Sequence, residues 1–318
     1  MYVYTIFAQV IHNRLYSGAA PNDKGTLLQL KHFINRTSYG KQPKHNMKAS
    51  EDFLEAVLSA HVVTAAKEIM ATKTLPTDCE AVAKAIVQQF VNITLPSDEP
   101  TTDSASSCDC VQAYAMDFLT LGLLWHGYHE SVRHGDGNRI LTYWKFLGVV
   151  FKEEGHFNYA KEAFNLLAQS ILLSPRKAAE LKWCRTVNTH GRVGKNIPVD
   201  LHMEHLNRKL KCMLRQLGSN IIPESIQRAS RALGAIESVC SNFEEVSEIL
   251  PESNHHSKPS YENDFVKLQE QLENEQVFSN KGNHQHHGFK KHKPLMSSLN
   301  WKKYSNWVKE QVVNYDAY

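Results

Sequence analysis

The feature that most constrains this chain is the helical spacing of its apolar residues. Between Ser50 and Ala71 the apolar side chains recur every three or four residues and so share one face of an α-helix. They are Phe53, Leu54, Val57, Leu58, Val62, Ala65, Ala66 and Ile69. Ser50 is a residue type that favours the N-cap position. The same spacing recurs over much of the chain, whereas Trp183–Val187 is the best strand candidate. We therefore predict a mainly α, multi-helix protein with at most two or three short strands.

Composition separates a long apolar part from a charged end. The stretch Leu95–Asp109 is rich in Pro, Ser, Thr and Asp, which predicts a loop or linker near residues 95–109. Ser241–Glu275 holds nine acidic residues and two lysines, and Val277–Lys309 holds seven lysines, four histidines and no acid. We predict a helical domain over residues 1–250. A charged, partly disordered tail with short helices is expected over residues 251–318.

Several classes of protein are disfavoured by composition. No run approaches the ~18 apolar residues that span a bilayer, and Met1–Val10 lacks the basic flank of a secretory signal. The six cysteines form no Cys-x-x-Cys pair, which argues against a zinc ribbon and a disulfide framework. A net charge of +3 is too small to imply a nucleic-acid partner by itself. We expect an intracellular protein without a membrane partner.

An ordered set of motifs carries a resemblance to a known family. The short ones are Lys24–Leu30, Ile34–Arg36, Glu51–Glu55, Gly135–Arg139, Tyr143–Phe146, Asn158–Ala163 and Leu166–Gln169. The longest and most specific joins Val187–Gly191 to Asn196–Arg208. In this order they resemble the family called domain of unknown function 6589, from about Val10 to Glu310.

The resemblance implies that sequence is missing before Met1. Family members carry upstream motifs of the Gly-Asp-Gln-Leu-Thr and Asp-Trp-His types, and neither occurs here. We interpret the family as related to RNase H-like transposases, so this chain would keep the helical part of a truncated catalytic domain. Its first helix would then expose the apolar residues Ile6, Val10 and Leu15, which favours self-association.

Two acidic residues are candidates for remnants of a catalytic site. Glu204 begins a predicted helix after a basic, glycine-rich loop, and Asp136 lies between two glycines. An intact site of this type would bind Mg²⁺ or Mn²⁺ between carboxylates; we expect no other cofactor. The alternatives are that Glu204 forms a surface pair with Arg208 four residues later, and that Asp136 caps the next helix. His202 and His205 lack the spacing of the His-Glu-x-x-His zinc motif, so no metal site is predicted there.

Two basic regions are candidate nucleic-acid contacts. The first is the loop and helix that contain Arg185, Arg192, Lys195 and Arg208. The second is the tail, with Lys290, Lys291 and Lys293 followed by the aromatic residues Trp301, Tyr304 and Trp307. Contacts of this kind predict weak, non-specific binding of DNA or RNA that falls with salt. A plain surface loop and a solvated tail are the alternatives.

Our first hypothesis is a transposon-derived, nucleic-acid-associated protein, located in the nucleus rather than the cytoplasm. We expect no enzymatic activity from this chain, because one carboxylate cannot hold two metal ions. The alternative is a helical scaffold or protein-interaction protein with no nucleic-acid role.

Overall fold

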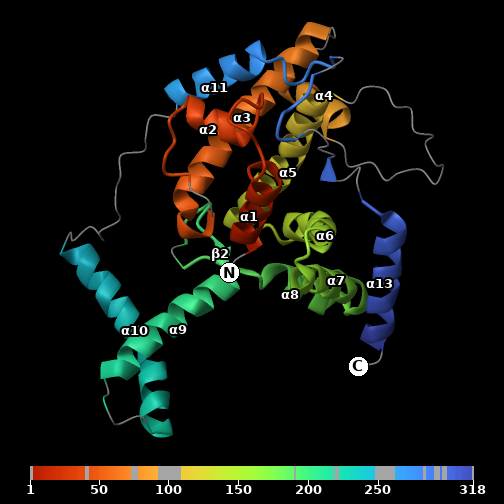
Figure 1. Ribbon diagram of the computed structural model, residues 1–318. Helices are drawn as coiled ribbons and strands as arrows, with labels where there is room; N and C mark the ends of the chain where they lie inside the picture. The colour runs from red at the N-terminus through yellow and green to blue at the C-terminus, as the bar shows by residue number, and fades with distance from the viewer. Residues whose placement is uncertain are drawn as a thin grey trace. The chain divides into compact units, whose positions relative to one another are not determined.

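The computed structural model describes residues 3–39, 43–72, 78–91, 109–189, 191–216, 218, 222–247, 262–281, 284–289, 294–295 and 299–316. The fold is mainly α-helical, which confirms the predicted class (Figure 1). The α-helices are α1 (Val3–Leu15), α2 (Leu27–Phe33), α3 (Met47–Thr72), α4 (Cys79–Phe90), α5 (Cys110–His134), α6 (Gly137–Glu153), α7 (Phe157–Leu172), α8 (Pro175–Trp183), α9 (Val199–Gln216), α10 (Pro223–Val246), α11 (Glu262–Asn274) and α13 (Trp301–Asp316). A 3-10 helix spans Pro43–His45. None of the described helices combines the length and apolar character needed to cross a lipid bilayer.

The chain divides into two compact units. Unit 1 comprises Met1–Ser131, Asp136–Lys182 and Ser260–Tyr318, and unit 2 comprises Val132–Gly135 and Trp183–Pro259. This division differs from the predicted domain at 1–250 and tail at 251–318, because the C-terminal part of the chain belongs to the first unit. The predicted linker at 95–109 lies, except for Asp109, outside the described residues.

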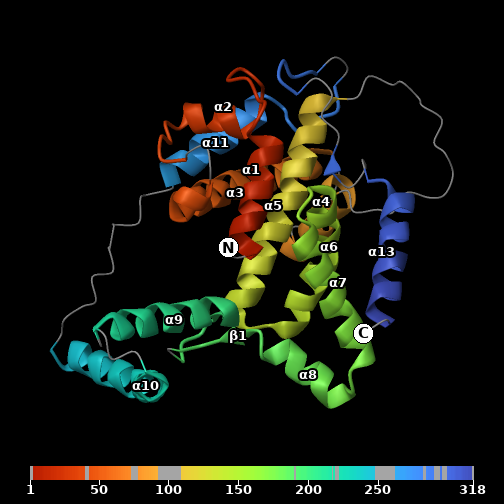
Figure 2. The same ribbon diagram turned by 60° about the horizontal axis from the view of Figure 1, so that its bottom comes forward.

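Helix α1 is a central element of unit 1. Phe7 and Ile11 are completely buried, and Phe7 meets Phe151 of α6 edge to face. Arg14 forms a salt bridge with the buried Asp117 of α5, with Nε 2.7 Å from Oδ2. Figure 2 shows α1 running beside α5. The helix is thus held by apolar packing along its length and by an ion pair near its end.

The predicted exposure of the N-terminal apolar face is wrong. Ile6, Val10 and Leu15 retain at most 5% of their accessible surface. Helices and loops from distant parts of the sequence cover them; for example, the Tyr114 hydroxyl of α5 donates a hydrogen bond to the Leu15 carbonyl oxygen at 2.7 Å. The exposed surface on which the expectation of self-association rested is therefore absent from α1.

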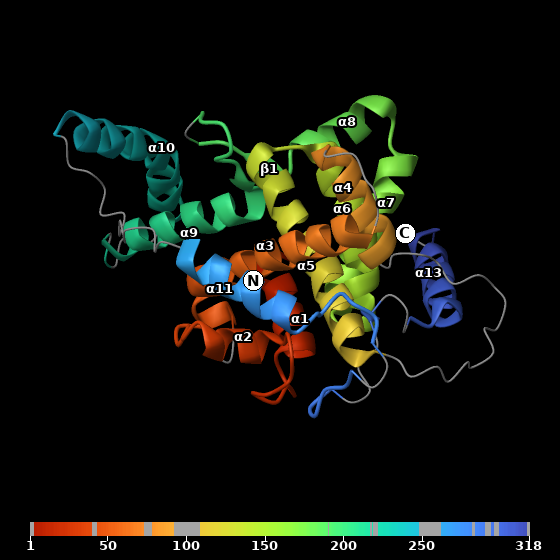
Figure 3. The ribbon, with the colours of Figure 1, turned by 90° about the horizontal axis from the view of Figure 1, so that it is seen from above.

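The C-terminal part of unit 1 packs against the N-terminal helices. Helix α11 lies along α3 (Figure 3), with Leu268 and Leu272 fully buried. Asp264 accepts a hydrogen bond from Arg36 Nε at 3.0 Å, and Glu273 accepts one from Lys67 Nζ at 2.7 Å. The acidic residues of this helix therefore pair with cations of the N-terminal part of unit 1.

Three buried aspartates hold the segment that follows α11. Asp23 Oδ2 accepts a hydrogen bond from Gly288 N at 2.9 Å, Asp109 Oδ2 accepts one from Lys281 N at 2.9 Å, and Asp117 Oδ1 accepts one from Leu295 N at 2.8 Å. Each bond pairs a carboxylate with a backbone N–H, which is a strong type of hydrogen bond. The described residues between Lys281 and Leu295, called here the C-terminal segment, are therefore fixed in place instead of forming part of a free tail.

Unit 2 consists of a short hairpin and two helices. Strands β1 (Thr186–Val187) and β2 (Ile197–Pro198) pair antiparallel, with Val187 opposite Ile197. Helix α9 begins directly after β2 and packs against α10. From Trp183 to Ser247, every described residue with an assigned burial is exposed or half-buried. The unit therefore has very little core of its own.

Proline begins two of the helices, and two other local features differ from expectation. Pro175 begins α8 and Pro223 begins α10, and proline favours this first helical position. Helix α3, however, begins at Met47. Its first turn is capped by Asn46, whose Oδ1 accepts a hydrogen bond from Ala49 N at 3.2 Å. Ser50 instead lies inside the helix and donates to the Asn46 carbonyl oxygen. The strand predicted over Trp183–Val187 is reduced to Thr186–Val187, because Trp183 ends α8.

Candidate nucleic-acid interface

The hairpin of unit 2 presents two of the predicted basic contacts. Arg192 and Lys195 are exposed in the connection between β1 and β2. The Asn188 side-chain amide donates to the Arg192 carbonyl oxygen at 2.8 Å, which closes this connection into an ordered turn. Gly191 and Gly194 adopt φ values of 63° and 71°, a region that glycine enters without steric cost. His190 lies outside the described residues.

The same connection is attached to the end of α5. Asn196 donates from its backbone N and from Nδ2 to the Arg133 carbonyl oxygen, at 3.1 and 2.9 Å. Arg133 in turn directs its Nε to the Gly194 carbonyl oxygen at 3.4 Å. These contacts fix the backbone that carries Arg192 and Lys195. Arg185, in contrast, is half-buried, and its carbonyl oxygen accepts a hydrogen bond from Val199 N at 3.0 Å. The role of the half-buried Arg185 side chain as a nucleic-acid contact stays a prediction.

Helix α9 carries a row of exposed cations of its own. Arg208, Lys211 and Arg215 are exposed and lie three and four residues apart, so they share one side of the helix. The row is about 10 Å long, from the 1.5 Å rise per residue. The opposite side carries Leu206, Leu210 and Met213, which are half-buried. The described residues of Trp183–Gln216 contain seven Lys or Arg residues and the two acids Asp200 and Glu204, so this part of unit 2 is net positive.

Glu204 lies at the N-terminal end of this row. Its side chain is exposed on the side of α9 away from the half-buried leucines. Among the described residues, Glu204 belongs to no group of three or more His, Cys, Asp or Glu side chains close enough to share a metal ion. The geometry thus matches a surface residue of a basic helix, and the catalytic role of Glu204 stays a prediction.

Asp136 performs the capping function that was the alternative to catalysis. Its Oδ1 accepts hydrogen bonds from Asn138 N at 3.1 Å and from Arg139 N at 3.0 Å. It is the N-cap of α6, and Gly135 before it has a φ of 68°. Both capping bonds use the same carboxylate oxygen, so Asp136 is a structural residue of the turn between α5 and α6.

The structure describes only part of the candidate contacts in the tail. Lys290, Lys291 and Lys293 lie outside the described residues. Trp307, predicted as a stacking partner for bases, meets Phe164 of α7 at a centroid distance of 6.5 Å and lies under the Lys152 ammonium group. Because Trp301 and Tyr304 are also half-buried, the aromatic residues of α13 are engaged in packing within unit 1.

The fold and the exposed charges together define a mainly α-helical protein with a small, basic two-helix unit. The chain belongs to DUF6589, a family of unknown function, whose model matches residues 3–256. This confirms the family predicted from the ordered motifs. No curated protein and no solved structure matches the chain.

Proposed function

We propose that this chain is a transposon-derived, nucleic-acid-associated protein that binds phosphate backbones through unit 2. The observation that carries the proposal is the exposed row Arg208, Lys211 and Arg215 on α9, the helix that follows the hairpin with the exposed Arg192 and Lys195. Lysine and arginine side chains that contact phosphates release counterions, so binding of this kind is non-specific and falls steeply with salt.

Strand cleavage is not part of the proposal. Asp136 Oδ1 is occupied by two backbone N–H groups, and Glu204 lies outside any cluster of ligating residues described here. The link to RNase H-like transposases therefore concerns ancestry. Metal-dependent cleavage of DNA that disappears in Glu204→Ala would show that this part of the proposal is wrong.

The binding test uses charge-matched variants of the full chain. One variant replaces Arg208, Lys211 and Arg215 by alanine. The control replaces Lys145, Lys161 and Lys177, which are exposed on helices of unit 1, so both variants lose the same charge. Fluorescence anisotropy with labelled single- and double-stranded DNA of random sequence, from about 50 to 200 mM salt, gives affinity and salt slope.

We expect the first variant to bind more weakly and to lose about 2.7 from the logarithmic salt slope for duplex DNA, since each phosphate contact contributes about 0.9. The control should keep the wild-type slope. Equal losses in both variants would indicate an effect of net charge alone. Absence of wild-type binding at about 50 mM salt would refute the proposal.

A second candidate function rests on α10. Ile236, Val239, Phe243 and Val246 recur at spacings of three and four, and their exposed fractions are 45%, 66%, 63% and 84%. A helix with an uncovered apolar row of this kind suits pairing with another helix. If the chain does not bind DNA, this exposed apolar row favours the alternative hypothesis of a helical protein-interaction protein. Sedimentation analysis of the wild type and Phe243→Ser tests it: an associating wild type and a monomeric variant would support this function.

A further inference from the structure

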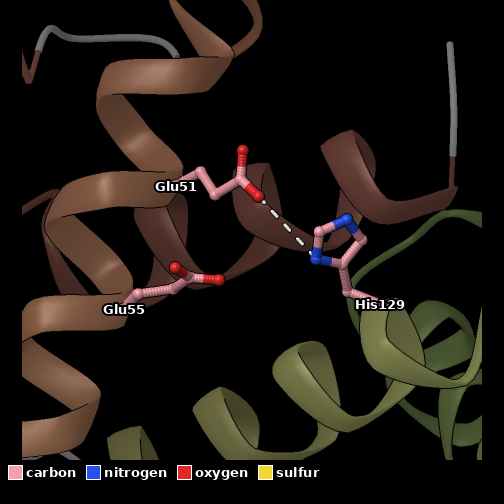
Figure 4. A group of neighbouring side chains, drawn as sticks. All are labelled: Glu51, Glu55 and His129. Atoms are coloured by element: carbon pink, nitrogen blue, oxygen red, sulfur yellow. Dashed lines mark ion pairs between the residues drawn. The ribbon is translucent and has the colours of Figure 1, made fainter. Parts of the chain in front are cut away.

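We propose that Glu51, Glu55 and His129 form a binding site for a transition-metal dication of the Zn²⁺ type. The two glutamates lie on α3 and the histidine lies on α5 (Figure 4). One ligand atom of each residue can be chosen so that all three atoms lie within 4.8 Å of one another. The site is entirely within unit 1 and is independent of the proposed nucleic-acid binding.

Helix geometry brings the three groups together. Glu51 and Glu55 are four residues apart and therefore project from the same side of α3. His129 directs Nδ1 toward Glu51, and the Nδ1–Oε1 separation is 3.7 Å. Figure 4 shows the Glu51 carboxylate and the His129 imidazole pointing toward one another, with the Glu55 carboxylate beside them. Two like-charged carboxylates four residues apart repel each other on a helix, and a cation between them would remove this repulsion.

The separation between His129 and Glu51 suits metal coordination better than a direct hydrogen bond between them. At 3.7 Å, the Nδ1–Oε1 distance between His129 and Glu51 is too long for a hydrogen bond. Zinc ligands at about 2.0–2.2 Å in a tetrahedron lie roughly 3.4 Å from one another. A rotation of the glutamate side chains would bring the remaining atom pairs, now within 4.8 Å, to this spacing.

The imidazole is held in the orientation that the site requires. Tyr4 of α1 stacks on the His129 ring at a centroid distance of 4.1 Å and on Trp125 at 4.8 Å. Because Tyr4 is itself stacked on the buried Trp125, it restrains the plane of the His129 ring. The Nδ1 edge of His129 therefore remains directed toward α3. A ligand whose ring is already oriented loses less conformational freedom on binding a metal.

The three side chains of the proposed metal site are partly buried and still reachable from solvent. The exposed fractions of the Glu51, Glu55 and His129 side chains are 18%, 38% and 20%. Burial raises the pKa of the Glu51 carboxyl, although the nearby Lys48 ammonium group acts in the opposite direction. His126, one turn before His129, has Nδ1 3.7 Å from Glu55 Oε1. We expect water to be the fourth ligand.

The ligand set selects the class of ion. Imidazole with carboxylates suits zinc and similar first-row dications, whereas magnesium and calcium prefer oxygen ligands alone. We therefore expect Zn²⁺ and its spectroscopic substitute Co²⁺ to bind, and Mg²⁺ in large excess not to displace them.

The test measures Co²⁺ and Zn²⁺ binding to the full chain under reducing conditions. Co²⁺ absorption reports the site directly, and the absence of a thiolate charge-transfer band separates it from the exposed cysteines Cys79, Cys184, Cys212 and Cys240. Two variants remove ligands: Glu51→Gln with Glu55→Gln, and His129→Phe, which keeps an aromatic ring for Tyr4. The control is Asp52→Asn, a neighbouring carboxylate whose partner is the exposed Lys48. Circular dichroism establishes that each variant is folded.

We expect the wild type and Asp52→Asn to bind one equivalent of Co²⁺ without thiolate absorption, and Zn²⁺ to displace it. Each ligand variant should weaken this binding by more than the roughly 10–100-fold that changes around a metal ligand cost. The proposal is overturned if the ligand variants bind Co²⁺ like the wild type, or if Mg²⁺ displaces Co²⁺ at comparable concentration.

Discussion

The buried histidine of α3 makes the stability of unit 1 sensitive to mild acid. His61 has no accessible surface and packs between Phe118 and Phe278, at ring-centroid distances of 4.7 and 6.0 Å. Its Nδ1 lies 2.8 Å from the Val57 carbonyl oxygen, which places the proton of the neutral ring on that nitrogen. Burial disfavours the charged imidazolium and lowers the pKa of His61 from 6.5 to about 4.

The sign and the size of the effect follow from these two pKa values. Between pH 6.5 and about 4 the unfolded chain binds a proton at His61 that the folded chain does not bind. Stability is therefore complete above pH 6.5 and is lost as the pH falls toward 4. With 1.36 kcal/mol per pKa unit, the loss between pH 7.5 and 4.5 amounts to about 2.5 kcal/mol.

Urea unfolding of the wild type and of His61→Leu across this pH range isolates the contribution. Leucine retains an apolar side chain at the site and cannot titrate. The wild type should lose about 2.5 kcal/mol more than the variant between pH 7.5 and 4.5. His32→Leu, at an exposed position of α2, is the control and should keep the wild-type pH dependence. Parallel pH curves for the wild type and His61→Leu would refute the reasoning.

Three further substitutions test the described contacts. Asp136→Ala removes the cap of α6 and should lower the free energy of unfolding by about 1 kcal/mol, whereas Asp136→Ser should retain most of it; urea titration measures both. Gly288→Ala places a methyl group against the Gly18 carbonyl oxygen and 2.6 Å from Asp23 Oδ2, so it should displace the C-terminal segment. Hydrogen exchange at residues 284–289 should then accelerate, and unchanged protection would contradict the packing described here. Glu204→Ala changes an exposed position and should alter stability by less than about 0.5 kcal/mol in thermal unfolding; a larger loss would indicate a buried role.

The sequence by itself determined the helical class and the approximate extent of the long helix α3. Apolar spacing of three and four residues needs only local geometry, because a helix turns once every 3.6 residues. Thus the helix predicted from Ser50 to Ala71 is observed as Met47–Thr72. For Asp136 the sequence left a catalytic role and a capping role open, and the structure shows the cap. The family was also readable from ordered motifs, and the profile match confirms it.

Only the tertiary structure decided which surfaces are covered and which side chains meet. Periodicity gives the direction of an apolar face but does not say what packs on it, so Ile6 and Val10 were expected to be exposed and are buried. The attachment of the C-terminal segment through Asp23 depends on residues more than two hundred positions apart in the sequence. The contact between Glu51 and His129 likewise joins residues that are far apart in the sequence. The spacing of the glutamates shows that they share a side of α3, whereas their meeting with the histidine depends on the packing of α3 against α5. Long-range contacts are set by the combined packing of all the helices, and no local pattern specifies them.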